Sequence, residues 1–124
     1  MGRSYKDLVA WQRAMELVTA TYLSTKNFPM EERFGLTSQL RRAAVSIPSN
    51  IAEGQGRLSE KEFRHFLGQA RGSLMEVETQ LQIAQNLGYI DARETLELLK
   101  KCAEVGRILN GLMASICHPS DPTH

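Results

Sequence analysis

The side chains best suited to chemistry in this sequence are cations in the middle of the chain. Between residues 38 and 71 basic residues outnumber acidic ones by six to three, and they are Arg41, Arg42, Arg57, Lys61, Arg64 and Arg71. Lys61, Arg64 and Arg71 fall within about two and a half turns on one side of a helix, with His65 adjacent. Clustered Lys and Arg neutralise phosphate groups, so the pattern predicts a surface that could contact RNA or DNA. The alternative is that these cations are solvated and paired with nearby carboxylates.

The charge of the whole chain limits how strongly these cations could act alone. The formal net charge is only +1, and from residue 72 onward acidic residues outnumber basic ones by seven to four. We therefore expect a single subunit to bind nucleic acid weakly. If identical subunits form a ring, however, each basic patch is repeated and the summed potential increases.

Patterns typical of catalysis are weaker. The serines on either side of Pro48 lie in no GxSxG elbow and have no histidine close by in sequence. Glu76 and Glu78 point to different sides of a helix, as positions two apart must, so they form no carboxylate pair. The glycines at 54 and 56 follow no expected strand, which argues against a nucleotide-cradling loop. Because no nucleophile or general base is nominated, we predict no catalytic residues and no enzyme.

Metal and cofactor sites are not predicted either. Cys102 and Cys117 would lie about 22 Å apart on one helix, too far for a disulfide, so both are expected to be reduced thiols. The sequence has no CxxC motif and only three histidines, His65, His118 and His124. A tetrahedral metal site is therefore not expected.

The segment around Pro48 differs from the rest of the chain. Small and polar residues crowd the turn after the proline, which lets neighbouring backbones approach closely. The residues concerned are Ser46, Pro48, Asn50, Glu53 and Gly54. We interpret Ser46, Asn50 and Glu53 first as structural polar groups that hold this end of a helix, and second as part of a binding surface.

Four segments show the periodicity of amphipathic helices. The first ends at Asn27-Phe28-Pro29, because the residue before a proline leaves the α region. Its apolar stripe consists of Leu8, Trp11, Met15, Val18 and Tyr22. The second segment places on one face Leu36, Leu40, Ala43, Ile47 and Ile51. Pro48 removes a backbone hydrogen bond from this helix, so we expect a kink near residues 45–48, and the glycines at 54 and 56 end it in the left-handed cap conformation.

The third and fourth segments have clear starts. Ser59 and Glu62 form a capping box before the third helix, and Gly88 ends it. Its stripe follows the alternation of a bundle seam through Phe63, Leu67, Ala70, Leu74, Val77, Leu81 and Ala84. Asp91, with Glu94 three residues on, opens the fourth helix. The stripe expected to be buried there is Leu98, Cys102, Val105, Leu109, Leu112 and Ile116.

These elements predict an all-α fold with one core, since 124 residues make a single domain. Helices joined by short connections pack antiparallel, so we expect an up-down-up-down four-helix bundle over residues 1–117 and a flexible tail at 118–124. No apolar run approaches the ~20 residues of a membrane span and no signal sequence is visible, which predicts a cytoplasmic location and no membrane partner. A second apolar stripe is either a wide core-facing surface or a subunit interface, and its residues are Ile83, Leu87, Leu96, Leu99 and Ile108.

Several ungapped motifs resemble a known family. The run at residues 36–54, LTSQLRRAAVSIPSNIAEG, is similar to the signature of the bacterial four-helix bundle proteins named after 23S rRNA intervening sequences. The same likeness extends to Leu8-Val9-Ala10-Trp11-Gln12, to Glu62-Phe63 with Phe66-Leu67, and to EVETQL at 76–81 followed by Leu87-Gly88-Tyr89. The motifs occur in the same order and span roughly residues 4–117.

The resemblance implies a bundle that assembles into a homopentameric ring and has no enzymatic activity. The family is also similar to the accessory subunits of diversity-generating retroelements, which form pentamers and bind a reverse transcriptase and nucleic acid through basic surfaces. By this likeness Arg41 and Arg42 match paired basic positions of the signature, and Arg57, Lys61 and Arg64 lie where members are often basic. The expected partners are identical copies and RNA, DNA or a nucleoprotein. The alternative is a protein-binding scaffold without affinity for nucleic acid.

Overall fold

The four expected helices are present in the computed structural model, which describes residues 4–116. They are α1 (Val9–Thr25), α2 (Leu36–Gln55), α3 (Glu60–Asn86) and α4 (Ala92–Ile116). Two short 3-10 helices, η1 (Tyr5–Asp7) and η2 (Met30–Glu32), precede α1 and α2. The described residues contain no strand, so the all-α prediction is confirmed. The tail expected at residues 118–124 lies outside the described residues, as does Cys117.

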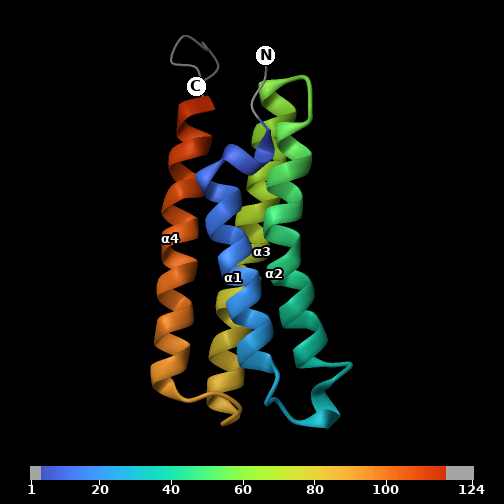
Figure 1. Ribbon diagram of the computed structural model, residues 1–124, viewed down its shortest axis with the longest axis vertical. Coiled ribbons are helices and arrows are strands. Elements are labelled where there is room, and N and C mark those ends of the chain that lie inside the picture. Colours follow the sequence, from blue (N-terminus) through green and yellow to red (C-terminus); the bar gives the residue numbers. More distant parts are fainter. Residues whose placement is uncertain (1–3, 117–124) are drawn as a thin grey trace.

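The helices lie side by side as a bundle, and successive helices run in opposite directions in Figure 1. The α1–α2 and α3–α4 connections are at one end, and the α2–α3 connection is at the other. Ser24 near the end of α1 donates a hydrogen bond of 2.6 Å to Glu94 near the start of α4. Between residues 4 and 116 no helix is both long and apolar enough to cross a membrane.

The core lies between the four helices and contains most of the stripes expected for α2, α3 and α4. The fully or almost fully buried members are Leu40, Ala43, Ile47 and Ile51 of α2, Leu67, Ala70, Leu74, Val77, Leu81 and Ala84 of α3, and Leu98, Cys102, Val105 and Leu109 of α4. Stripe residues at the helix ends are only half-buried, and they are Leu36, Phe63, Leu112 and Ile116. The periodicity therefore placed the core correctly on three of the four helices.

The apolar stripe of α1 is not its core face. The buried residues of this helix lie on a neighbouring face and are Ala10, Ala14, Leu17, Thr21 and Thr25. The threonine hydroxyls can be buried because Thr21 donates to the Leu17 carbonyl at 2.8 Å and Thr25 to the Thr21 carbonyl at 2.9 Å. Met15 and Tyr22, from the expected stripe, are each 40% exposed. The other three members, Leu8, Trp11 and Val18, are partly buried and pack against the core, so Met15 and Tyr22 are the stripe residues available at the surface.

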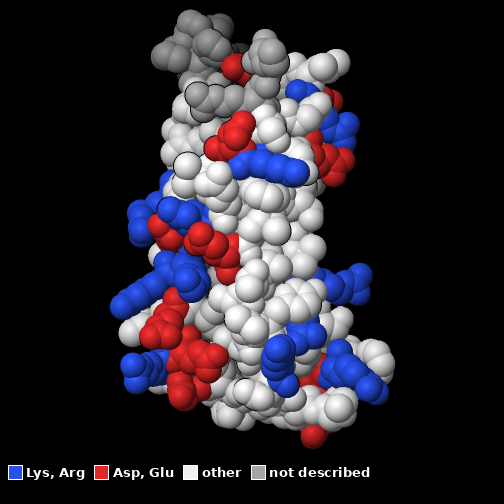
Figure 2. Space-filling model, viewed as in Figure 1, with Lys and Arg blue, Asp and Glu red and all other residues white. Residues whose placement is uncertain are grey.

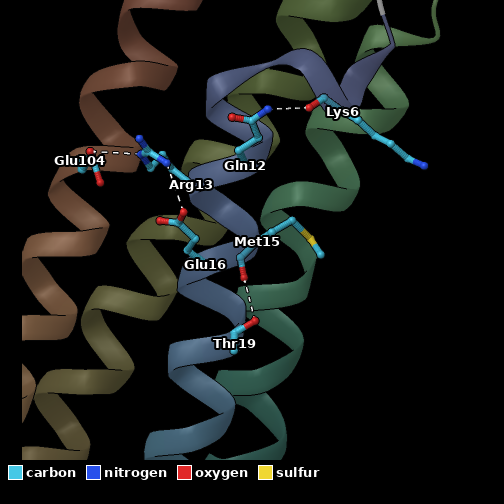
Figure 3. A network of polar contacts seen from close by, with 7 residues as sticks. All are labelled: Lys6, Gln12, Arg13, Met15, Glu16, Thr19 and Glu104. Carbon is cyan, nitrogen blue, oxygen red and sulfur yellow. Dashed lines mark hydrogen bonds and ion pairs between the residues drawn. The ribbon is translucent and has the colours of Figure 1, made fainter.

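The sides of α1 differ in charge, as Figure 3 shows. Arg13 forms ion pairs with Glu16 at 3.2 Å and with Glu104 of α4 at 3.4 Å. Met15 points away from these charged groups. The charged side of α1 thus faces α4, and the side that faces α2 has no ion pairs.

The ends of α3 and the start of α4 form as expected. Ser59 accepts a hydrogen bond of 3.0 Å from the Glu62 amide, and Asp91 accepts one of 2.8 Å from the Glu94 amide. Gly88 has a φ of +79°, the left-handed conformation that glycine adopts without a steric penalty. The short connection after α3 is therefore encoded locally.

The end of α2 differs from the expectation. Gly56 caps this helix with a φ of −80°, so it adopts right-handed geometry and not the left-handed cap. Pro48 is buried inside α2, which is continuous from Leu36 to Gln55. The kink at Pro48 stays a prediction.

The second apolar stripe divides into two parts. Leu99 and Ile108 pack against the core, as the wide core-facing interpretation requires. Ile83, Leu87 and Leu96 are 42%, 54% and 55% exposed. These three side chains remain available for contact with another molecule.

Candidate nucleic-acid interface

Three of the six candidate cations lie together at the end of the bundle where α2 leads into α3. Arg57 is in the connection, and Lys61 and Arg64 are one turn apart at the start of α3. All three are exposed. We call this group the basic end. Figure 2 shows Lys and Arg next to Asp and Glu at this upper end of the bundle.

The three cations of the basic end have different surroundings. Arg57 pairs with Glu53 at 2.7 Å, and its guanidinium lies 4.8 Å from the centroid of the Phe66 ring. Lys61 and Arg64 have no hydrogen bond or ion pair to the described residues. Because the Arg57–Glu53 pair is solvent-exposed, its contribution is about 0–1 kcal/mol and it can be broken cheaply. Lys61 and Arg64 are therefore best placed to contact a phosphate.

Arg41 lies at the other end of the bundle and contributes to the fold. Its Nε donates to the Thr25 hydroxyl at 2.8 Å, and its guanidinium lies 4.6 Å from the centroid of the Tyr22 ring. A cation at the last turn of α1 also interacts favourably with the helix dipole. Arg41 thus connects α2 to α1, and a phosphate would have to compete with these contacts.

Arg42 of α2 and Arg71 of α3 point to different surfaces of the bundle, the first between α2 and α3 and the second between α3 and α4. Arg42 lines a groove between α2 and α3 that also contains Glu76. Arg71 donates a hydrogen bond of 3.0 Å to Asn110 and so connects α3 to α4. The six candidate cations therefore do not form one continuous surface, and only the basic end groups three of them.

The polar residues around Pro48 make contacts within the bundle. The Ser46 and Ser73 hydroxyls are 2.8 Å apart and join α2 to α3. Asn50 donates to the Ser46 carbonyl at 2.8 Å and to the Ser46 hydroxyl at 2.9 Å. A Cβ atom at Gly54 would lie 2.8 Å from Cβ of Phe66, so only glycine allows the observed distance between the two helices. These contacts are structural in kind.

Comparison with known proteins places the chain in a family. Residues 6–111 match the family described as 23S rRNA-intervening sequence protein. The chain belongs to this family. Its fold is similar to that of a protein of unknown function from the S23 ribosomal protein family of Bacteroides thetaiotaomicron, with a TM-score of 0.76 and 21% sequence identity over 85% of this chain and 98% of that chain. No curated protein matches the sequence.

The most exposed apolar side chains of this 23S rRNA-intervening sequence protein were not identified from its periodicity. Leu58 is 104% exposed, Phe34 85% and Met30 72%. Met30 lies in the short helix η2, and Phe34 and Leu58 lie in connections, so none of the three belongs to a long helical face that would reveal it. A sequence feature that could have identified two of these residues is a single large apolar residue next to an arginine, as in Arg33-Phe34 and Arg57-Leu58.

An uncharged groove runs between α1 and α2. Its lining residues are Tyr5, Trp11, Met15, Val18, Val45, Pro48, Ser49 and Ala52. Tyr22, one turn beyond Val18 on α1, is 40% exposed. Figure 2 shows a broad band without charged residues over these two helices. We call this surface the α1–α2 face. Such a surface is suited to contact with another apolar surface.

The described residues offer little for metal or nucleophilic chemistry. Between residues 4 and 116 no group of three or more His, Cys, Asp or Glu side chains is arranged to hold a metal ion. Cys102 is buried, and burial, with a smaller contribution from the negative charge of Glu78, raises the pKa of its thiol to about 12. The thiol is therefore neutral at physiological pH.

Cys102 should resist alkylation in the folded protein. The folded-state pKa lies above the unfolded value of about 8.5, so the stability that the neutral thiol contributes is complete below pH 8.5 and declines as the pH rises toward 12. At pH 8 we expect iodoacetamide to modify Cys102 in denaturant but not under native conditions, as measured by peptide mapping. Equal modification under both conditions would show that the thiol is accessible.

Proposed function

We propose that this protein is a non-enzymatic helical bundle that assembles with identical copies and binds RNA or DNA, free or within a nucleoprotein, in the cytoplasm. The α1–α2 face makes the contact between subunits, and the basic end contacts phosphates. The observation that carries the proposal is the presence of both a charge-free apolar face and an exposed basic end on one small bundle. A ring of five subunits is the assembly that the family resemblance favours.

The composition of the α1–α2 face supports assembly. Its exposed apolar side chains include Met15, Tyr22 and Val45, each 40% exposed. Burying apolar surface stabilises a complex by about 25 cal/mol per Å², and no charged group in the lining of this groove would have to be desolvated. Stable interfaces bury roughly 800 Å² on each partner, which an elongated face along two helices could supply.

Assembly would make the basic end more effective. A single subunit offers three cations there, next to the exposed carboxylates of Glu53, Glu60 and Glu62, and its net charge of +1 gives little general attraction to phosphates. In a cyclic assembly every subunit points the same way, so the basic ends lie together on one rim. Repeated weak contacts then combine into a useful affinity.

A protein-binding scaffold is the second candidate function. It is favoured by the engagement of Arg41, Arg57 and Arg71 in contacts within the chain. The exposed apolar side chains of Ile83, Leu87 and Leu96 offer a surface for a protein partner. By resemblance to the accessory subunits of diversity-generating retroelements, such a partner could itself be an enzyme that acts on nucleic acid.

The deciding experiment measures RNA affinity at several salt concentrations together with the mass of the particle in solution. For the variant Arg57→Ala/Lys61→Ala/Arg64→Ala we expect weaker binding and a smaller dependence on salt. Each lost phosphate contact lowers the slope of log K against log salt by about 0.7–0.9, so the slope should fall by roughly 2 per subunit engaged. An oligomer that does not bind RNA even at low salt would reject this function in favour of the scaffold.

A matched control removes three exposed cations from α4. Arg93→Ala/Lys100→Ala/Lys101→Ala changes the net charge by the same amount and leaves the basic end intact. Its affinity should fall less than that of the first variant. If both variants lose affinity equally, the attraction depends on total charge and not on the basic end.

A further inference from the structure

The connection between α1 and α2 presents two large apolar side chains to solvent. Phe34 is 85% exposed and Met30 is 72% exposed. Isolated apolar residues are common on protein surfaces, but an aromatic ring that is almost completely exposed is typical of a contact site. The function proposed above does not use either residue.

The connection is anchored, so the exposure of Phe34 does not come from a loose chain. The Glu32 carboxylate accepts hydrogen bonds from the Leu36 amide at 3.0 Å and from the Tyr89 hydroxyl at 2.9 Å. These two bonds lower the pKa of Glu32. Phe28 is buried, with its ring 5.5 Å from that of Tyr89. A Cβ at Gly35 would lie 2.8 Å from the Glu32 carboxylate, so a larger residue there would displace this carboxylate from its hydrogen bonds. An ordered loop loses little conformational freedom on binding.

Cations lie at the same end of the bundle. The Arg33 guanidinium is 4.7 Å from the centroid of the Phe34 ring. Lys26 is exposed at the end of α1, and Arg41 is held against the last turn of that helix. The acidic side chains of the connection are Glu31, which is exposed, and Glu32, which is turned toward Leu36 and Tyr89. Figure 2 shows several Lys and Arg side chains at this lower end of α1 and α2.

We propose that Phe34 is a stacking site for an unpaired base of single-stranded RNA or DNA, with Arg33 and Lys26 contacting the neighbouring phosphates. Stacking needs an open aromatic face and cations that hold the backbone. The Arg33 guanidinium lies over one face of the Phe34 ring, and the 85% exposure of this side chain leaves the other face open to a base. A protein hot spot usually lies within a surrounding apolar zone that excludes water. Phe34 instead protrudes beside charged residues, which favours a nucleobase.

Stacking at Phe34 is independent of the basic end. The two sites lie at opposite ends of α2, whose 20 residues span about 30 Å. Neither assembly nor phosphate binding by Lys61 and Arg64 is required for a base to stack on Phe34. The two proposals can therefore succeed or fail separately.

The test measures, at low salt, the affinity of the full chain for a short single-stranded oligothymidine and for a strand of equal length with abasic sites. The wild type should prefer the strand with bases by about 5- to 150-fold, the range expected for one stacked base. The variant Phe34→Leu keeps an apolar side chain but removes the aromatic face, so it should lose this preference. Phe34→Trp should keep it.

Three outcomes would overturn the proposal: equal wild-type affinity for both strands, no wild-type binding at all, or full affinity in Phe34→Leu. Because Phe34 is exposed, its substitution should leave the melting temperature unchanged, which a thermal melt verifies. The variant Arg57→Ala/Lys61→Ala/Arg64→Ala should keep the preference for bases even where its overall affinity falls. If the triple variant loses affinity and Phe34→Leu does not, the result would support phosphate binding at the basic end and contradict stacking at Phe34.

Discussion

Replacing Ile47 with alanine should destabilise the bundle by about 2–5 kcal/mol. Ile47 is completely buried in the middle of α2, and truncation removes apolar contacts and leaves a cavity that the surrounding helices can fill only in part. For a chain of this size the melting temperature should fall by roughly 10 °C or more. Thermal or urea unfolding at one fixed protein concentration measures the change, since assembly would make the midpoint depend on concentration.

Val45→Ala is the matched control. Val45 lies two residues earlier on the same helix but is 40% exposed on the α1–α2 face. Its truncation should change the stability of the isolated fold by less than about 1 kcal/mol. A similar loss from both substitutions would contradict the position of the core on α2. A change of particle mass in Val45→Ala alone would point to the α1–α2 face as a subunit contact.

The helices and most of the core could be predicted because their signals are local. Ser59 and Asp91 mark helix starts through hydrogen bonds that span three residues, and Gly88 marks an end through its own backbone conformation. The core stripes of α2 to α4 contain large apolar side chains at the helical period, with polar residues elsewhere. On these helices the stripe with the most large apolar side chains is the buried one, although α3 and α4 also carry the exposed residues Ile83, Leu87 and Leu96.

The core face of α1 could not be found in the same way. Its buried residues include two alanines and two threonines, which score weakly as apolar, whereas Trp11, Met15 and Tyr22 score strongly. The two threonines can be buried because their hydroxyls donate hydrogen bonds to carbonyls of their own helix. Which of two apolar faces is buried depends on packing against the other helices, and no local pattern in the sequence contains that information.

The candidate cations were predicted from residue type and, for Lys61, Arg64 and Arg71, from helical spacing, so contacts between helices could not be derived. Lys61 and Arg64 are one turn apart, which the sequence states directly. Arg41 is drawn against Tyr22 and Thr25, and Arg71 against Asn110. These partners are distant in sequence, and only the arrangement of the helices brings them together. The exposure of Phe34 could not be predicted for a related reason. It depends on the hydrogen bond between Tyr89 and Glu32, which holds the connection and joins residues distant in sequence.

Gly54→Leu is expected to destabilise the bundle by about 3 kcal/mol. A Cβ atom at position 54 would lie 2.8 Å from Cβ of Phe66 and 3.0 Å from the Phe63 ring. The Phe63 ring can rotate, but Cβ of Phe66 is fixed to the backbone of α3, so the two helices would have to separate. The remaining atoms of leucine increase the overlap. The loss is measured by urea unfolding, and a melting temperature equal to that of the wild type would contradict this close packing of α2 on α3.

Gly72→Leu separates steric overlap from helix propensity. Gly72 also lies inside a helix, but it is exposed, and a Cβ there would meet no atom within 4 Å. Leucine forms helices better than glycine, so this substitution should stabilise the folded chain by up to about 1 kcal/mol. If Gly54→Leu destabilises the bundle and Gly72→Leu stabilises it, glycine is required at position 54 for contact between α2 and α3. Glycine at position 72 then only lowers the stability of the helix, because nothing within this chain needs the missing side chain. Destabilisation by Gly72→Leu would mean that another molecule packs against this part of α3, and a parallel loss of particle mass would identify that molecule as a second copy.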